Sequence, residues 1–509
     1  MLTKEDFIQS AEHAIGRLRE VHGDKPPVVS DVVDAQGNQY VNLVQEGGGV
    51  LGVALVGYTY VLEKMGIRFM KMAGTSAGAI NTLLLATVGK KEEEKSLKIL
   101  DILSKQNLFD FVDGDPKAKW LIKQAIASKG FTKRIKRAII ALIAVFIVSL
   151  LGSFWGWGNQ FKSVAAWVFL GMLAASALAS IWLWLWIKDK KKKFYNSEYG
   201  INPGKVFTQW VEKNLADNGI HNLTDLNNHL AQVPEGKFRL RSEATNESLH
   251  DLNNPKPENF LVLVTSDITN QMKVEFPRMW NLYWDDPAKV NPAQFVRASM
   301  SVPIFFEPLI VSGIVPDKVL MAWKEFGGAT STDDIKNEAR FVDGGIISNF
   351  PINVFYNPNV AVPRLPTFGV LLDDEALPSN NGTPQKSTFR QYASAMFSTL
   401  RSHYDKEFLL KNAAWKRTIG RIDVRGVNWL NFNITEAEKL ELFRRGAEAA
   451  ADFLLGEGLL APPAIPKPAE EFEGLESISR STEPPKKGFN WAGYKEYRKE
   501  INKALKQPD

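Results

Sequence analysis

The sequence predicts an α/β protein with a mainly parallel central sheet that is interrupted by a pair of apolar helices. Short apolar runs alternate with segments of helical periodicity on both sides of the interruption, an order typical of parallel β-α-β units. Two uncharged runs, Ala138–Trp157 and Val164–Ile187, follow one another in the middle of the chain. The length of 509 residues, 45% of them hydrophobic, is enough for one large domain or two to three ordinary ones.

The first part of the chain contains two strand-loop-helix units. In the first, the apolar run Tyr40–Gln45 enters three successive glycines, and aliphatic residues follow at helical spacing over Val50–Met65. In the second, a strand over Ile67–Ala73 enters the turn Gly74–Gly78, and a helix follows over Ala79–Val88. Two such units in succession favour parallel strands with crossover helices.

The two uncharged runs predict a transmembrane hairpin. Each has about the 20 residues that a spanning helix needs, and only Gly158–Ser163 separates them, so the helices run antiparallel. The basic runs Lys129–Arg137 and Lys188–Lys193 flank the pair, which places this side of the membrane in the cytoplasm. Two alternatives remain: a hairpin that dips into one leaflet, and a pair of fully buried helices in a soluble core.

Small residues in the second apolar helix recur at a spacing of four. Gly171, Ala175 and Ala179 are therefore expected to face the first helix and to allow close packing. The hairpin is also a candidate surface for a homo-oligomer, with copies of the same two helices packing together.

After the hairpin the pattern predicts two helices and four buried strands. The helices are expected at Gly204–Leu215 and Leu223–Leu230, and the strands at Phe260–Thr265, Ile304–Ile310, Arg340–Val342 and Thr367–Leu372. From Ala461 onward the chain is rich in Pro, Lys and Glu, which favours an extended tail with one short helix around Trp491–Leu505.

Composition and charge exclude several classes of site. The chain has no cysteine, so it has no disulfide scaffold, thiol nucleophile or thiolate-held metal. The six histidines lie in polar segments without the HExxH spacing, which gives a metal site little support. The net charge of +5 comes from the two basic runs beside the hairpin, and the rest of the sequence has 52 basic and 56 acidic residues. We therefore expect no nucleic-acid partner.

The pentapeptide Gly74–Gly78 (GTSAG) fits the pattern G-x-S-x-G. A serine in this pattern lies on a sharp strand-to-helix turn, with its hydroxyl above the sheet and near the positive N-terminus of the next helix. The pattern alone is weak in a chain with 37 glycines, but here a strand precedes it and a helix follows. Ser76 is therefore the candidate nucleophile.

A second glycine motif, Gly47–Gly52 (GGGVLG), also joins a strand to a helix and exposes backbone N–H groups that suit an anion. It could bind a nucleotide phosphate, although no Walker lysine follows and the spacing differs from G-x-G-x-x-G. It could instead form an oxyanion hole for acyl transfer at Ser76. The serine pattern shortly downstream favours the oxyanion hole.

The third motif, Phe341–Gly345 (FVDGG), is a strand that ends in Asp343 and two glycines. This carboxylate could accept the serine proton. Taken alone, it reads better as a turn aspartate. The histidines offer no better base, because they stand in polar segments.

Together and in this order, these motifs resemble the patatin-like phospholipases. That family carries a GGGxxG-type oxyanion loop, a GxSxG turn, a segment R-A-S-x-x-x-P-x-x-F-x-P and a D-G-G/A motif. The corresponding segments here are Gly47–Gly52, Gly74–Gly78, Arg297–Pro308 (RASMSVPIFFEP) and Asp343–Gly345. The resemblance covers Asn42–Asp374, with the hairpin as an insertion, and it implies a three-layer α/β/α fold.

The resemblance also implies roles for individual residues. Ser76 would be the nucleophile and Asp343 its base, without a histidine, a metal or a cofactor. The backbone N–H groups of Gly47, Gly48 and Gly49 would form the oxyanion hole, and the supporting glycines would be Gly52, Gly74, Gly78, Gly344 and Gly345. One departure is Glu46, which stands where many members of the family have Asp.

The expected protein is a membrane-anchored serine acyl hydrolase that releases fatty acids from glycerophospholipids through an acyl-enzyme. A lysophospholipid or triacylglycerol hydrolase and a catalytically silent lipid-binding membrane protein are the alternatives. Membrane phospholipids would be both substrate and anchor, and the protein would be integral with its catalytic domain on the cytoplasmic side. The expected order is an N-terminal helical segment (1–40), a first patatin-like part (41–128), the hairpin with its basic flanks (129–193), a second patatin-like part (194–460) and the tail (461–509).

Overall fold

The computed structural model describes most of the chain as two compact units. The described residues are 2–23, 25–116, 119, 131–158, 164–241, 249–373, 399, 403, 405–456 and 489–504. The predicted hairpin turn beyond Gly158 and the Pro-rich segment from Ala461 lie outside them. The first unit comprises Met1–Phe111, Lys205–Val302 and Pro308–Asp509, and the second comprises Val112–Gly204 and Pro303–Glu307.

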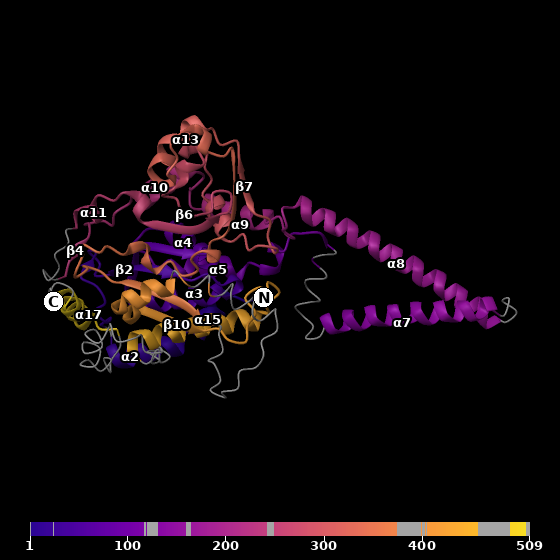
Figure 1. Cartoon of the computed structure of the whole chain (residues 1–509). Coiled ribbons are helices and arrows are strands. Elements are labelled where there is room, and N and C mark those ends of the chain that lie inside the picture. Colours follow the sequence, from indigo (N-terminus) through magenta and orange to yellow (C-terminus); the bar gives the residue numbers. More distant parts are fainter. Residues whose placement is uncertain are drawn as a thin grey trace. The chain divides into compact units, whose positions relative to one another are not determined.

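The first unit is built on a mixed sheet of ten described strands, whose middle is parallel (Figure 1). The strand order is β10-β9-β2-β3-β5-β8-β7, and the strands from β10 to β5 pair in parallel. Strands β8 and β7 pair antiparallel beyond β5, and β1, β4 and β6 add antiparallel pairs. Their bounds are β1 Val32–Val33, β2 Gln39–Gln45, β3 Ile67–Thr75, β4 Arg239–Leu240, β5 Leu261–Asp267, β6 Met272–Phe276, β7 Leu309–Ser312, β8 Glu338–Asp343, β9 Thr367–Asp373 and β10 Ile419–Asp423.

Helices and short helical turns cover the two faces of this sheet. On β9, Phe368 packs edge-on against Phe453 of α15, with ring centroids 5.0 Å apart. The next residue, Gly369, faces the other way, because a Cβ atom there would lie 2.5 Å from the ring of Phe350. Since successive residues of a strand point to opposite faces, α15 and the segment around Phe350 lie on opposite sides of the sheet. The expected α/β class with helical layers on both faces is confirmed.

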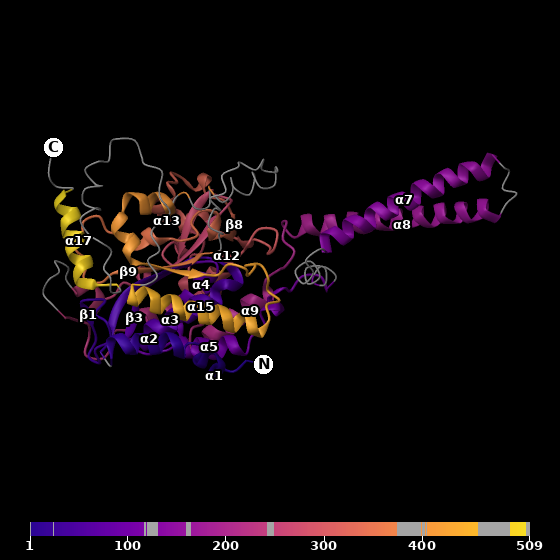
Figure 2. The ribbon, with the colours of Figure 1, turned by 90° about the horizontal axis from the view of Figure 1, so that it is seen from below.

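Helices α3 and α15 cross at direct backbone contact. A Cβ atom on Gly446 of α15 would lie 1.9 Å from the carbonyl oxygen of Ala54, and one on Gly57 would lie 2.0 Å from that of Phe443. Figure 2 shows α3 and α15 side by side along the sheet, with α2 and α5 nearby. The helices of this unit are α1 Lys4–Ser10, α2 Glu12–His22, α3 Gly52–Lys64, α4 Ala77–Thr87, α5 Ser96–Ser104, α9 Lys205–Ala216, α10 Leu223–Leu230, α11 His250–Asn253, α12 Ala293–Ser299, α13 Pro316–Ala322, α15 Glu436–Leu455 and α17 Trp491–Ala504.

The predicted elements of the first unit form with one exception. The helices expected after each glycine turn, at Gly204–Leu215 and at Leu223–Leu230 are present within a few residues, and so is the terminal helix as α17. The predicted strand Ile304–Ile310 is wrong over most of its length, since β7 begins only at Leu309. Residues 303–307 belong instead to the second unit, and Ile304 has a left-handed φ of 71°. The long helix α15 and the strand β10 were not predicted.

The second unit contains the predicted helical pair as α7 (Phe131–Gly158) and α8 (Val164–Asn196), which pack along each other. The base of the pair is held to residues 303–307 through Asn202. Its N–H donates to the carbonyl of Phe305 at 3.0 Å, and its own carbonyl accepts the Glu307 N–H at 2.9 Å. Its side-chain oxygen accepts the Gly114 N–H at 3.0 Å.

The two long helices bury small residues and expose large apolar ones. Ser149, Ser153 and Ser176 are buried, and Gly152 packs so closely on Phe169 that a Cβ atom there would lie 2.3 Å from the ring. Large apolar side chains are exposed along both helices; they include Phe154, Trp157, Trp167, Leu178 and Trp182. The expectation that Gly171, Ala175 and Ala179 face the first helix is wrong, because all three are exposed.

Within the described residues, one helical stretch is long and apolar enough to cross a bilayer by itself. It is Val164–Trp186 in α8, with a mean hydropathy of 2.0. The apolar part of α7, Ile140–Trp155, is shorter. This supports association with a membrane, and the spanning hairpin stays a proposal.

Candidate active site

Ser76 lies on a strained turn between β3 and α4. Its φ of 52° and ψ of −119° are in a region that non-glycine residues rarely adopt. The turn leaves no room at its flanks, since a Cβ atom on Gly78 would lie 2.4 Å from the Gln45 carbonyl oxygen. Ser76 is 5% exposed and precedes the first turn of α4. The predicted strand-turn-helix context of the GTSAG motif is therefore present.

The strained turn is held by a serine of the predicted R-A-S segment. The Ser76 N–H donates to Oγ of Ser299 at 2.9 Å, and that hydroxyl donates onward to the Val264 carbonyl at 2.6 Å. Ser299 is fully buried at the end of α12. Its hydroxyl therefore links the serine turn to the middle of β5.

Asp343 ends β8 at the level of the serine turn. Thr75 of β3 pairs with Val264 of β5, and the next β5 residue, Thr265, pairs with Asp343. The chain after Asp343 folds back over β5, because a Cβ atom on Gly344 would lie 2.1 Å from the Val264 carbonyl oxygen and 3.0 Å from Thr75 Cγ2. The sheet thus brings two residues that are far apart in the chain to one place.

The backbone and side chain of Asp343 are both fixed. Its N–H donates to the Ser301 carbonyl at 2.8 Å, and its Oδ1 accepts the Gly345 N–H at 2.7 Å. Ser301 follows α12, and its hydroxyl bonds the side chain and the carbonyl of Arg297. The segment Ser299–Ser301 therefore holds the N–H groups of both candidate catalytic residues.

The glycine loop lies beside Ser76 and has two unused N–H groups. The Gly47 N–H donates to the Asn349 carbonyl at 3.0 Å, so the expectation that it serves an oxyanion hole is not met in this conformation. Within the described part of the chain, the N–H groups of Gly48 and Gly49 have no hydrogen-bond acceptor. Gly49 has a φ of 54°, and η1 (Gly49–Leu51) begins there. A Cβ atom on Gly52 would lie 3.0 Å from Cβ of Ala77, which follows Ser76.

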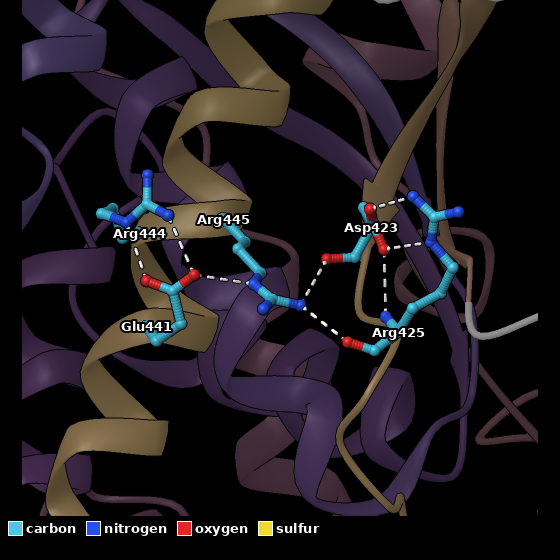
Figure 3. A network of polar contacts seen from close by, with 5 residues as sticks. All are labelled: Asp423, Arg425, Glu441, Arg444 and Arg445. Carbon is cyan, nitrogen blue, oxygen red and sulfur yellow. Dashed lines mark hydrogen bonds and ion pairs between the residues drawn. The ribbon is translucent and has the colours of Figure 1, made fainter.

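The loop after β10 supports the glycine loop from outside. The Val50 N–H donates to the Trp429 carbonyl at 3.0 Å, and a Cβ atom on Gly49 would lie 2.2 Å from that oxygen. The start of this loop is tied to α15 by Arg445, whose guanidinium donates to the carbonyls of Asp423 and Arg425 at 3.3 and 3.0 Å (Figure 3). The same network includes ion pairs from Arg425 to Asp423 and from both Arg444 and Arg445 to Glu441.

A buried carboxylate supports the segment that follows Asp343. Asp405, in the helical stretch 405–411, accepts the Ser348 hydroxyl at 2.7 Å and the Phe350 N–H at 2.9 Å. The Ser348 carbonyl in turn accepts the Thr75 hydroxyl at 3.0 Å. Burial raises the pKa of Asp405 to about 6, although these hydrogen bonds act in the opposite direction.

Sequence reasoning singled out Ser76, Asp343 and the glycines, whose catalytic roles stay predictions, but it did not single out the residues that support them. Ser299 was quoted only as part of a motif, and Asn349, Asp405 and Trp429 were not singled out. Asn349 stands six residues after Asp343 in the same loop, and its side chain contacts Glu46 and Gly47. Only the position of Ser299 inside the R-A-S segment offered a signal, because the other three act through contacts between distant segments.

Comparison with known proteins gives the family of the chain. The chain matches the model of the patatin-like phospholipases over residues 43–356. It is 24% identical over 417 residues to YqhO of Bacillus subtilis strain 168, a protein described as uncharacterized; the match covers 82% of this chain and 98% of that relative. Among solved structures, VipD from Legionella pneumophila is 14% identical with a TM-score of 0.32, over 84% of this chain and 70% of that one.

The match to the family model defines the chain as a lipid acyl hydrolase. The family model covers more than half of its length, so the chain belongs to the patatin-like phospholipase family.

Proposed function

We propose that this hydrolase cleaves acyl esters of membrane phospholipids with a dyad of Ser76 and Asp343. The strained turn at Ser76 carries this proposal, because a non-glycine residue at a φ of 52° persists only where the surroundings hold it. Here the surroundings do so through Ser299, and the sheet pairing puts Asp343 at the same level. The fixed N–H of Asp343 and the Gly345 contact to its carboxylate orient the proposed base.

The steps follow from this arrangement. Asp343 takes the proton of the Ser76 hydroxyl as Oγ attacks the ester carbonyl, and the N–H groups of Gly48 and Gly49 stabilise the tetrahedral oxyanion. The alcohol leaves with the proton from Asp343, and an acyl group remains on Ser76. Water then gives a proton to Asp343, attacks the acyl carbonyl and releases the fatty acid, and Ser76 regains its proton. These steps call for no cofactor or metal.

The surface of the hairpin supports the membrane part of the proposal. In a water-soluble helical pair, large apolar residues face inward and polar ones outward. The pair α7 and α8 has the opposite arrangement, with buried serines and with Trp157 76% exposed. Helices that pack in lipid bury small and weakly polar residues in this way. We propose that both helices span the bilayer and hold the catalytic domain on the cytoplasmic side.

The second candidate is hydrolysis of lysophospholipids or triacylglycerols. The proposed dyad would cleave any acyl ester that reaches Ser76. A bilayer anchor favours phospholipids, because they surround the hairpin at high local concentration. Self-association through the hairpin is a further proposal, for which the exposed residues of α8 provide a surface.

The activity is tested by fatty-acid release from vesicles of phosphatidylcholine and phosphatidylglycerol, from lysophospholipid and from triacylglycerol emulsions, with calcium chelated. The purified full-length protein should release fatty acid, and both Ser76→Ala and Asp343→Asn should abolish release while remaining folded. Ser96→Ala is a matched control, because Ser96 is another fully buried serine, bonded to Thr59 on a different part of the domain. Release that survives in Ser76→Ala would reject the dyad.

The membrane arrangement can be tested with single cysteines, because the natural chain contains none. A cysteine at Gly158, at the tip of α7, and one at Lys191, in the basic end of α8, should react with an impermeant maleimide from opposite sides of a sealed vesicle. Reaction of both from the same side would reject the spanning hairpin. Deletion of 138–187 should also release the protein from membranes, and continued sedimentation with membranes would point to another anchor.

A further inference from the structure

The residue before the glycine loop, Glu46, bridges two distant segments. Its Oε2 accepts the Leu372 N–H of β9 at 2.7 Å, and its Oε1 accepts Nδ2 of Asn349 at 2.9 Å. Leu372 lies near the end of the neighbouring strand, and Asn349 lies in the loop that begins at Asp343. A single carboxylate therefore ties the start of the glycine loop to both.

Asn349 in turn encloses Gly47. Its carbonyl accepts the Gly47 N–H at 3.0 Å, and its Nδ2 donates to the Gly47 carbonyl at 3.1 Å. Since Nδ2 faces two acceptors, the Gly47 carbonyl and the carboxylate of Glu46, the orientation of the side-chain amide is determined. The peptide groups on both sides of Gly47 Cα are thus bonded to one residue.

The side-chain oxygen of Asn349 completes the enclosure. A Cβ atom on Gly47 would lie 2.6 Å from Oδ1 of Asn349 and 3.0 Å from Cβ of Ser76. Asn349 is 8% exposed, and its Oδ1 is buried. Gly47 is therefore confined between Asn349 and Ser76, with no space for a side chain at that position.

We infer that Asn349 and Glu46 are positioning residues that fix the place of the glycine loop relative to Ser76. Asn349 takes up both polar groups of Gly47 and is itself held by Glu46, which leaves the N–H groups of Gly48 and Gly49 as the next two donors along the loop. The inference rests on the proposed function of this site. It adds that the loop carrying the proposed base and the loop carrying the oxyanion donors are coupled by direct hydrogen bonds.

The inference predicts a particular kinetic signature. A positioning defect would move the N–H groups of Gly48 and Gly49, which act mainly when negative charge develops on the oxygen of the ester carbonyl. It should therefore lower kcat with little change in KM. Loss of one oxyanion donor typically costs about 100- to 1,000-fold in kcat. A displaced donor retains part of its effect, so we expect a loss of about 10- to 100-fold for a variant that disrupts the pair.

The pair allows a test by exchange of its donor and acceptor. Asn349→Asp places a carboxylate against that of Glu46. In Glu46→Gln, the new amide N–H faces another donor, either Nδ2 of Asn349 or the Leu372 N–H. In the double variant, the amide introduced at position 46 can donate to the carboxylate introduced at position 349, while the oxygen of the same amide accepts the Leu372 N–H. We expect each single variant to lose at least 10-fold in kcat. The double variant should lose clearly less than the product of the two single losses, because it restores the contact between positions 46 and 349 but not the donor to the Gly47 carbonyl.

The control is Asn42→Asp, which puts a carboxylate at another asparagine of 8% exposure that joins β2 to Thr367. It should lower the free energy of unfolding but leave kcat of the folded protein unchanged. The inference is overturned if the two single losses multiply in the double variant, or if either single variant keeps the kcat of the natural protein. Ser76→Ala, measured alongside, separates these outcomes from failure of the proposed function, which would show as activity that survives in that variant.

Discussion

The replacement of Ser299 by alanine is the perturbation that most directly tests how the serine turn is held. The hydroxyl accepts the Ser76 N–H at 2.9 Å and donates to the Val264 carbonyl at 2.6 Å, and all three residues are buried. In Ser299→Ala the Ser76 N–H loses its acceptor without gaining access to water. A buried donor left without a partner costs about 1–3 kcal/mol.

This penalty falls on a turn that is already strained. A non-glycine residue in such a conformation costs on the order of 1–3 kcal/mol, which the surrounding contacts must offset. We therefore expect Ser299→Ala to lower the free energy of unfolding by about 2–3 kcal/mol. A shift of this size in the energy of the reactive conformation corresponds to a roughly 30- to 150-fold slower reaction at Ser76.

The assay is the rate of covalent labelling by a fluorophosphonate, measured beside urea unfolding. Ser96→Ala removes a hydroxyl of equal burial elsewhere and should lose stability without slower labelling, and Ser299→Thr should restore much of the rate. If Ser299→Ala is labelled as fast as Ser96→Ala, the reasoning is refuted, because the hydroxyl would then support the fold and not the turn.

Three further predictions concern stability. Gly446→Ala should lower the free energy of unfolding by about 3 kcal/mol, because the added methyl group would overlap the Ala54 carbonyl 1.9 Å away at the crossing of two helices. Lys495→Ala should lower the melting temperature and cost about 3 kcal/mol, since it leaves the carboxylate of Asp31, 3% exposed, without the ammonium group 2.9 Å away. Asp405 should make the free energy of unfolding fall as pH rises, because its pKa is raised from 3.8 to about 6 in the folded protein. Its stabilising contribution is complete below pH 3.8 and is lost as pH rises through 6, by about 3 kcal/mol in all. Urea unfolding between pH 4 and 7.5 should show this slope in the natural protein and a flatter one in Asp405→Asn.

Each of these predictions has a control or a contrary outcome. Gly16→Ala, in α2 with nothing within 4 Å of the new methyl group, should raise stability by about 0.5–1 kcal/mol. Lys213→Ala breaks an exposed pair with Asp217 and should cost less than about 1 kcal/mol. If Gly446→Ala and Gly16→Ala changed the free energy of unfolding equally, the packing argument would be contradicted. Equal effects of Lys495→Ala and Lys213→Ala would contradict the argument from burial. An Asp405→Asn variant with the same pH slope as the natural protein would assign the slope to another group.

Local patterns in the sequence were sufficient to predict the strands and helices that carry the proposed catalytic residues. Ser76 could be singled out because a strand, a glycine turn and a helix leave a periodic signal within about a dozen residues. Asp343 was singled out only through the resemblance to the family, because its own segment reads equally as a turn. Asn349 and Trp429 act on the glycine loop through hydrogen bonds to segments hundreds of residues away, and such contacts leave no periodic signal. The commitment of the Gly47 N–H to Asn349 could not be foreseen for the same reason.

Two errors have a physical explanation. The run Ile304–Ile310 is apolar and resembles a buried strand, but its first residues pair with Asn202 at the base of the hairpin and Ile304 turns to a positive φ. The choice of Gly171 for the helix contact assumed that the smallest residues mark the interface. In the structure, Gly152 of α7 fits closely against Phe169 of α8, and the buried residue beside Ala175 is Ser176.

The order of these parts along the chain bears on how the protein is made. The serine turn is synthesised first, the hairpin second, and β8 with Asp343 only about 150 residues after the hairpin ends. Because β5 and β8 must pair before Asp343 reaches the level of Ser76, no amino-terminal fragment released during translation contains a complete dyad. A ribosome would thus deliver the proposed anchor to the bilayer before the proposed lipid-cleaving centre can assemble, so that the activity would arise only at the membrane.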